Sequence, residues 1–483
     1  MYSINKILNK YNDISLPIKA SIWFIICSCI QKGISVITVP IFTRLLTTSQ
    51  YGLYSVYQSW CGIISIFATL NLYAGVFNNG MLKYKKDKDG FQSSLLTLSL
   101  TITILLAIIY LIFQQFWNNI FKLSTPLVMA MFIDCFFSVG ISFWSAKQRF
   151  DYKYKALVLI TITSSIIAPI LGIIGVLLTT TYKVEARIFS FIFINIIFGG
   201  ILGTIILIKG KKFYVKQYWK FALAFNIPLI PHYLSQTILN QADRIMISRM
   251  VSDEKAAVYS VAYSAAMLMT IFSQSINNSF IPWTYKALED KKYDELRQVS
   301  KMLIVLIAGI SFVVILFAPE LISILASKEY SEAVKIIPPV AGSVFFMFVY
   351  PLFGNIEFYL ENTKFIMIAS SIAAAINIIF NYYFIPIYGY GAAGYTTLIC
   401  YILLCIVHYI FMKKLCLKNG ISLSIYDIKF IVKFSSVYII SIIFVSFIYK
   451  YMLIRYIIII MLVLLTIIKR EKIIDIIKRL KRK

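Results

Sequence analysis

Four basic side chains stand inside or beside long apolar stretches of this 483-residue chain. An ionisable residue at the centre of a lipid bilayer costs about 2.5–3.5 kcal/mol on insertion scales, so it faces a cavity or a partner. Lysine and arginine bind anionic oxygens through charge-assisted hydrogen bonds, which predicts a path for an anionic ligand. The alternative is that these cations reach the membrane interface or stabilise helix C-termini. The four residues are Lys32, Arg44, Arg244 and Arg249.

Oxygen-bearing side chains recur in three of the apolar stretches. Asn377 and Asn381 are four residues apart, so they share one face of a helix. Asp243 would add a carboxylate, and Thr396 or Thr397 would add a hydroxyl. These are the ligands that Na⁺ needs, so the set predicts a cation site. Hydrogen bonding between helices, which is common for asparagine in membrane bundles, is the competing interpretation.

Two lone acids, Asp134 and Glu357, lie inside apolar runs. Each is expected to pair with a cation across a central lumen, and a proton relay is the second interpretation. Asp243 and Arg244 are adjacent in the chain, so on a helix their side chains point about 100° apart and should meet different neighbours. His408 is solitary in the sequence. The acids are therefore predicted to serve ion pairing or coupling.

Motifs for catalysis or for ATP hydrolysis are absent from the sequence. There is no G-x-x-x-x-G-K-[ST] segment, which excludes a P-loop. The seven cysteines have no metal-type spacing. The loops expected on the outer side are short and leave no room for a catalytic domain. We therefore predict that the protein is not an enzyme and has no cofactor other than a coupling Na⁺ or H⁺.

Membrane-spanning helices must position these residues. Hydrophobic residues make up 60% of the chain, charged residues 14%, and the mean hydropathy is +0.81. A helix crosses the hydrocarbon core, about 30 Å thick, with roughly 20 apolar residues. We predict an all-α integral membrane protein with 14 spans near 18–43, 52–77, 93–117, 125–146, 156–180, 186–208, 221–248, 256–283, 300–326, 336–360, 365–386, 391–412, 428–449 and 452–468.

The basic residues gather in every second gap between these spans. The net charge of +26 would suggest nucleic acid for a soluble protein, but this alternation argues against that partner. Orientation in a bacterial membrane follows the lysine and arginine content of short loops. Both termini are therefore predicted to be cytoplasmic, with the basic tail 478–483 near anionic lipid.

An internal repeat appears at an offset of 205 residues. Residues 44–67 align with 249–272 without a gap, and seven of the 24 aligned positions are identical. Six spans separate the two copies, so both copies run in the same direction across the membrane, as in transporters built from parallel repeats. We predict a six-helix lobe over 1–215, a second over 216–420, and helices 13 and 14 with a basic tail over 421–483.

Three segments resemble one known family. Arg44–Tyr54 resembles its "R-L-L-x-x-x-x-Y/F-G-x-Y" turn, and Asp243–Ile247 with Tyr259–Tyr263 resembles its "D-R-x-x-I … Y-S-x-A-Y" segment. Asn377–Asn381 and Pro386–Ala393 resemble "N-x-x-x-N … P-x-x-G-x-x-G-A-A". The chain is similar to the Wzx-type polysaccharide flippases of the multidrug/oligosaccharidyl-lipid/polysaccharide exporter superfamily. One departure is Ala256-Ala257 in the second repeat, where the first has Tyr51-Gly52.

The resemblance implies a fold like that of the multidrug exporters in this superfamily. It implies transport of an undecaprenyl-diphosphate-linked oligosaccharide, such as an O-antigen unit of lipopolysaccharide, from the cytoplasmic to the periplasmic leaflet of the inner membrane. Related lipid-linked flippases carry an ion at helices 7, 11 and 12, which points to Asp243, Asn377 and Asn381 as Na⁺ ligands. A polysaccharide polymerase and a chain-length regulator are the implied protein partners.

Two other functions remain open at this stage. A cation-coupled multidrug exporter of the same superfamily would need acids in the lumen, whereas the charges within the predicted spans lean to lysine and arginine. A membrane polysaccharide polymerase would need a large outer loop with catalytic acids or arginines, and the outer loops here are short. The sequence therefore favours a flippase, without identifying its sugars.

Overall fold

The computed structural model describes residues 15–362 and 364–468, which excludes the basic tail predicted near anionic lipid. These residues form α-helices and short 3-10 helices, with no strand among them. In lipid every backbone N–H and C=O must be satisfied within the segment, which an α-helix achieves. The chain divides into two compact units, residues 1–46 with 57–233 and residues 47–56 with 234–483. The lobe boundaries expected after residues 215 and 420 stay predictions.

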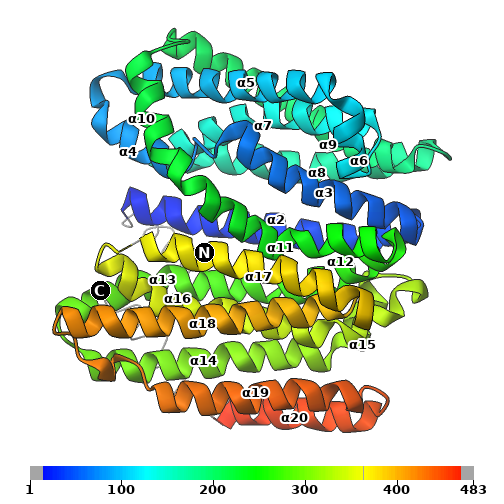
Figure 1. Cartoon of the computed structure of the whole chain (residues 1–483), viewed down its shortest axis with the longest axis vertical. Coiled ribbons are helices and arrows are strands. Elements are labelled where there is room, and N and C mark those ends of the chain that lie inside the picture. Colours follow the sequence, from blue (N-terminus) through cyan, green and yellow to red (C-terminus); the bar gives the residue numbers. More distant parts are fainter. Residues whose placement is uncertain (1–14, 363, 469–483) are drawn as a thin grey trace, which may run out of the picture. The chain divides into compact units, whose positions relative to one another are not determined.

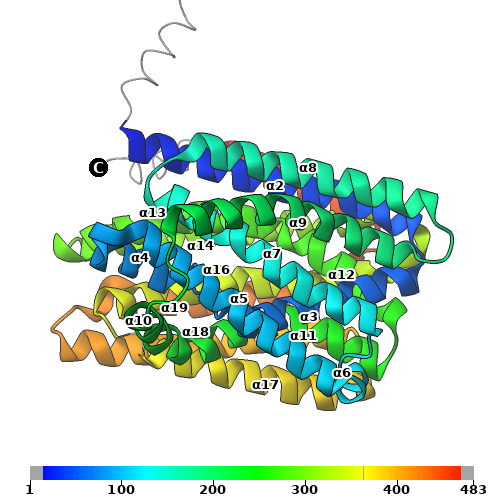
Figure 2. The same ribbon diagram turned by 90° about the horizontal axis from the view of Figure 1, so that it is seen from above.

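In the first unit, α8 packs against both α2 and α9, and α9 packs against α7. Figure 2 shows α2 and α8 side by side over most of their length. Most of α3 also belongs to this unit. The bounds are α2 (Leu16–Leu45), α3 (Thr48–Thr69), α4 (Gly75–Lys83), η1 (Lys85–Asp87), α5 (Lys88–Ile112), α6 (Gln114–Phe121), α7 (Thr125–Phe150), α8 (Tyr154–Leu178), α9 (Lys183–Gly210) and α10 (Lys216–Asn226).

Small residues bring α7 and α9 close together. A Cβ atom on Gly199 would overlap the carbonyl oxygen of Phe137, and one on Gly140 would lie 2.5 Å from the carbonyl oxygen of Gly199. Helices in membranes associate through such close backbone contacts, because lipid supplies no hydrophobic drive between them. Larger side chains at these two positions would force the helices apart.

In the second unit, the closest helix pairs are α16 with α18 and α17 with α18. Figure 1 shows α19 and α20 together beyond α14, at the edge of this unit. η2 (Ile227–Leu229) still belongs to the first unit. The bounds in the second unit are α11 (Ile230–Met250), α12 (Asp253–Met267), α13 (Met269–Glu289), α14 (Tyr293–Leu316), α15 (Ala318–Leu325), η3 (Lys328–Lys335), α16 (Ile337–Tyr359), α17 (Lys364–Tyr388), α18 (Ala392–Lys418), η4 (Leu423–Ile425), α19 (Ile428–Ile448) and α20 (Met452–Ile468).

Every predicted span coincides with helix, and five predicted spans are interrupted. Two of them, 93–117 and 300–326, break at Phe113 and Phe317. The span 221–248 is α10 and α11, separated by η2 at Pro228, because proline cannot donate to a helix interior. The span 256–283 divides at Leu268 into α12 and α13. The span 52–77 breaks after α3, where Leu70 and Asn71 have positive φ.

Eleven helical segments of the described chain are long and apolar enough to cross a membrane. The other three predicted spans are α3, α11 and α20. Glutamine, asparagine, aspartate and arginine side chains make α11 polar for a span, and α20 has only 17 residues. The protein is therefore a multi-pass, all-α membrane protein in which one polar helix lies among apolar ones.

The start of the first repeat packs on the start of the second. Residues 47–56 belong to the second unit, where a Cβ atom on Gly52 would overlap the carbonyl oxygen of Asp253. The ring of Tyr51 meets that of Tyr330 edge-on, with 6.1 Å between centroids. Gly52 in α3 therefore permits a close approach to the backbone of Asp253 that a larger residue would block.

Candidate functional site

A cluster of polar side chains is buried among four helices of the second unit. At its centre is the carboxylate of Asp243, on α11, which is 1% exposed. Its Oδ1 accepts a hydrogen bond of 2.7 Å from Asn381 on α17. Its Oδ2 accepts one of 2.9 Å from Thr397 on α18 and another from the hydroxyl of Tyr259 on α12. The carboxylate is therefore held by neutral donors on three neighbouring helices.

A second ring of contacts surrounds these donors. Asn377 donates to the Thr397 hydroxyl at 3.1 Å and accepts from Asn381 at 3.3 Å. Thr396 donates to Oδ1 of Asn381 and to the carbonyl oxygen of Ala393. The four side chains of this ring are fully or almost fully buried. The cluster thus brings together all five residues predicted as oxygen ligands.

Local sequence explains this convergence. Asn377 and Asn381 are one helical turn apart on α17, and both threonines lie in the first turns of α18. The Gly389–Gly391 turn joins these helices in an antiparallel arrangement. The C-terminal half of α17 therefore lies beside the first turns of α18. Gly389 has φ +77°, a conformation that favours glycine.

The oxygens of this cluster fit a monovalent cation. The cluster contains one carboxylate, two amide oxygens and three hydroxyls, and hard cations prefer oxygen ligands. In the described residues there is no group of three or more His, Cys, Asp or Glu side chains that could hold a metal ion. A single carboxylate matches a single positive charge. The same contacts also satisfy the competing interpretation, hydrogen bonding between helices, so the cation role stays a prediction.

Arg244 lies next to Asp243 in sequence but has other partners. Its Nη1 donates to the carbonyl oxygen of Asn240 at 2.6 Å and to Gln241 at 2.8 Å. Its Nε donates to the hydroxyl of Ser260 at 3.2 Å, and its guanidinium lies 4.4 Å from the centroid of the Tyr263 ring. The two charges therefore face different neighbours, as helix geometry predicts.

The other three predicted cations occupy different environments. Lys32 is partly buried in α2, in the first unit. Arg44 donates to the carbonyl oxygen of Pro40 at 2.7 Å, within the last turn of α2. Arg249 is exposed in the last turn of α11. Arg44 and Arg249 thus stand at matched helix ends, and a path for anions along the four residues stays a prediction.

The two lone acids have partners that sequence reasoning did not identify. Asp134 accepts a hydrogen bond of 2.7 Å from the amide of Asn195, in place of the expected cation. Glu357 faces His408, whose Nδ1 lies 2.9 Å from one carboxylate oxygen and 3.1 Å from the other. No sequence pattern relates positions on separate helices, so these pairs could not be predicted. Tyr259 was identifiable, because it lies in the segment that resembles the family motif.

Comparison with known proteins places this fold. The model of a family described as polysaccharide biosynthesis protein matches residues 18–288, and the MatE family model matches 228–383. An uncharacterised membrane protein of Haemophilus influenzae is 26% identical over 312 residues, which cover 63% of this chain and 74% of that protein.

Two solved structures show the same fold. The lipid II flippase MurJ, in an inward closed conformation, superposes with a TM-score of 0.70 at 18% identity, over 94% of this chain and 100% of that one. An inward-facing multidrug transporter of the MATE family, in the MOP superfamily, superposes with a TM-score of 0.57 at 12% identity, over 80% and 94% of the two chains. The chain therefore has the MATE-like fold.

Proposed function

Since this chain belongs to the polysaccharide biosynthesis protein family, we propose that it is a flippase for a lipid-linked oligosaccharide. The cargo is an undecaprenyl-diphosphate-linked repeat unit of an O antigen or a similar surface polysaccharide. It moves from the cytoplasmic to the periplasmic leaflet of the inner membrane by alternating access. The observation that carries this proposal is the family match over residues 18–288, on a fold that the chain shares with a lipid II flippase.

Na⁺ bound by the Asp243 cluster is the proposed coupling ion. A buried carboxylate without a full counter-charge is costly, and a cation at that point would offset the cost. Asn377, Asn381, Thr396 and Thr397 supply the remaining oxygens. A proton on Asp243 is the alternative, since it would remove the same charge. Asp134 and Glu357 remain candidates for ion pairing or a proton relay.

Lys32, Arg44, Arg244 and Arg249 are the proposed contacts for the diphosphate. Guanidinium groups bind phosphate oxygens in a bidentate manner, and ammonium groups bind them as point charges. Both termini are assigned to the cytoplasm by the distribution of basic residues. Membrane lipid, a polymerase and a chain-length regulator complete the proposed partners.

A multidrug exporter is the second candidate, because the MatE family model matches residues 228–383. The two functions differ in the charge of their cargo, which is anionic for the lipid-linked unit and cationic for most drugs of exporters. Loss of the gene would leave surface polysaccharide intact if the chain exports drugs.

Gene deletion followed by complementation tests the proposed function. Deletion should abolish the surface polymer and strand the lipid-linked unit on the cytoplasmic leaflet, and wild-type protein should restore both. Lys32→Ala and Arg244→Ala should fail to restore them when they are present at wild-type levels. If the unit reaches the outer leaflet in the deletion strain, the chain is not its flippase.

Asp243→Asn tests the coupling proposal separately. The amide keeps the shape of the carboxylate and most of its hydrogen bonds but removes the charge. We expect flipping by purified protein in vesicles to be faster in Na⁺ than in choline, and the variant to lose this difference. Asp253→Asn, which changes a carboxylate hydrogen-bonded to Ser248 in the same unit, is the matched control. An unchanged sodium response in Asp243→Asn would reject this site.

A further inference from the structure

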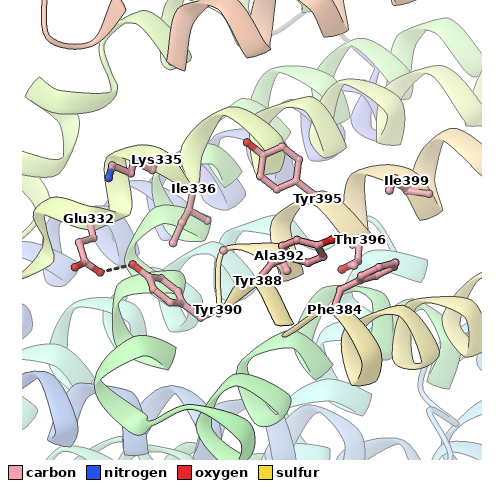
Figure 3. A pocket seen from close by; sticks show the side chains of 12 residues that line it. Glu332, Lys335, Ile336, Phe384, Tyr388, Tyr390, Ala392, Tyr395, Thr396 and Ile399 are labelled. Carbon is pink, nitrogen blue, oxygen red and sulfur yellow. Dashed lines mark hydrogen bonds between the residues drawn. The ribbon is translucent and has the colours of Figure 1, made fainter. Parts of the chain in front are cut away.

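A pocket of about 690 Å³ opens beside the α17–α18 turn in the second unit. Four aromatic side chains line it, and Figure 3 shows three of their rings, Phe384, Tyr388 and Tyr395, around its centre. Tyr388 is 72% exposed and Tyr395 46% exposed, so their ring faces are available to a ligand. Aromatic walls with a few fixed polar groups are typical of small-molecule sites.

The polar end of the pocket is an organised cluster of charges. Lys255 binds Oε2 of Glu332 at 2.5 Å, and the hydroxyl of Tyr390 donates to the same oxygen. The Lys255 ammonium also lies 5.0 Å from the centroid of the Tyr390 ring. The hydrogen bond from Lys255, followed by that from Tyr390, holds the pKa of Glu332 below its usual value. The wall itself contains one acid, Glu332, and one base, Lys335, while Lys255 pairs with Glu332 from outside the lining.

The turn leaves space for a ligand above it. A Cβ atom on Gly389 or Gly391 would have no other heavy atom within 4 Å. Both glycines line the pocket, so the backbone of the turn forms part of its wall without side chains to obstruct it. Figure 3 places the Glu332–Tyr390 hydrogen bond at one end of the pocket and Phe384 and Ile399 at the other.

Thr396 belongs both to this pocket and to the Asp243 cluster. It lines the pocket, and its hydroxyl donates to Asn381, which in turn donates to Asp243. A ligand that displaced the Thr396 hydroxyl would therefore alter a donor of the buried carboxylate directly.

We propose that this pocket binds a pyranose ring with an anionic substituent from the translocated oligosaccharide, and that Thr396 couples its occupancy to the Asp243 cluster. The inference rests on the proposed function, and it adds a sugar site within the second unit. The aromatic rings stack on the sugar, Lys335 receives the anionic group, and Glu332 accepts hydrogen bonds from hydroxyls.

Protection of an introduced thiol tests this site in the full-length protein in vesicles. Gly391→Cys places the thiol in the pocket, where its Cβ meets nothing, and mass spectrometry reads maleimide modification at that residue alone. The probes are the oligosaccharide released from the host's own lipid-linked intermediate, with and without its phosphate. We expect the probes to slow modification roughly tenfold, the effect of about 1.4 kcal/mol.

Matched tyrosine variants locate the protection. Tyr388→Ala should abolish it, whereas Tyr383→Ala should not, because Tyr383 lies on the same helix, is 61% exposed and is not part of the pocket. Protection should be stronger in Na⁺ than in choline, and Thr396→Val should remove that difference. If only the phosphorylated probe protects, the anionic group is the phosphate; if both protect, it belongs to the sugar.

Three results would overturn the proposal. These are no protection by either probe, equal loss of protection in both tyrosine variants, or protection by inorganic phosphate or phosphatidylglycerol alone. Flipping is measured on the same vesicles. Normal flipping without protection rejects the pocket and leaves the proposed function intact, whereas absence of flipping by wild-type protein rejects the function itself.

Discussion

Glu357 and His408 are titratable side chains that the structure buries completely between α16 and α18. Within the described residues, the hydrogen bonds of each are made with the other. With one proton between them the pair is neutral overall, which reduces the cost of burial. Removal of either partner leaves the other unpaired, and breaking a buried pair in this way costs about 3–5 kcal/mol.

Glu357→Ala and His408→Ala are therefore each expected to lower the free energy of unfolding by several kcal/mol. The double variant Glu357→Leu with His408→Phe should lose much less, because apolar residues of similar volume need no partner. Thermal unfolding of the purified protein measures all three. Equal losses in the single and double variants would show that packing, and not pairing, determines the effect.

Members of the Asp243 cluster could be predicted from the sequence where the spacing of residues within one helix shows which side chains share a face. Asn377 and Asn381 share a face at i and i+4, and Asp243 is the one acid in a polar helix, so these positions could be selected before the structure. His408 could not be matched with Glu357, because a separation of 51 positions follows no helical or strand period. Pairing across helices depends on how each helix is rotated, which the sequence of either helix does not specify.

α20 is attached to the rest of the second unit by a pair of charged residues. Arg455 makes two hydrogen bonds of 2.8 Å to the carboxylate of Glu320 on α15, and its Nη1 also donates to the carbonyl oxygen of Leu316 at 2.7 Å. Tyr456 adds a hydrogen bond of 3.0 Å to Glu320. Bidentate pairs of this kind are the stronger ion pairs. They fix the position of a helix that is otherwise aliphatic.

Glu320→Gln should loosen α20, and wild-type protein should show the same effect in acid. Protonation of Glu320 would remove the same negative charge as this substitution, and the ordinary pKa of a glutamate is about 4.3. Amide hydrogen exchange in α20, corrected for intrinsic rates, should therefore rise below about pH 4 in wild type.

Exchange in Glu320→Gln should be fast at all pH values, and exchange in α19 serves as the internal reference. A pH-independent α20 in wild type would contradict this role for the pair. The predicted span 452–468 has the bounds of α20, and Arg455 lies inside this helix. Its partner on α15 could not be predicted from the sequence of either helix.

The fold of the whole molecule was largely predictable because hydropathy and helix length are averages over many residues. All 14 predicted spans coincide with helix, and the fold expected from the family resemblance is the one found. The breaks within spans were not predicted, since proline-induced 3-10 turns and positive-φ residues involve only a few positions. The orientation of the molecule in the membrane stays a prediction.

Cysteine accessibility checks that orientation. Ser327→Cys lies in a loop predicted to be outside, and Lys291→Cys lies in a basic loop predicted to be cytoplasmic. In spheroplasts, a membrane-impermeant maleimide should modify the cysteine at 327 at once and the one at 291 only after lysis. The reverse pattern would place both termini outside and would reverse the direction of transport.

The electrical work of transport follows from the charges that move. Outward passage of a diphosphate with roughly two negative charges gains about 4.6 kcal/mol at 100 mV, interior negative, and one Na⁺ moving inward would add about 2.3 kcal/mol in the same direction. The ratio of cargo in the two leaflets at steady state can be measured in vesicles at clamped potentials. It should depend on the potential as expected for three moving charges in wild type and for two in Asp243→Asn. If the ratio depends on the potential as for two charges in both proteins, Na⁺ does not move with the cargo. A ratio independent of potential would mean that the cargo crosses without net charge, which the proposed anionic path through Lys32 and Arg244 does not allow.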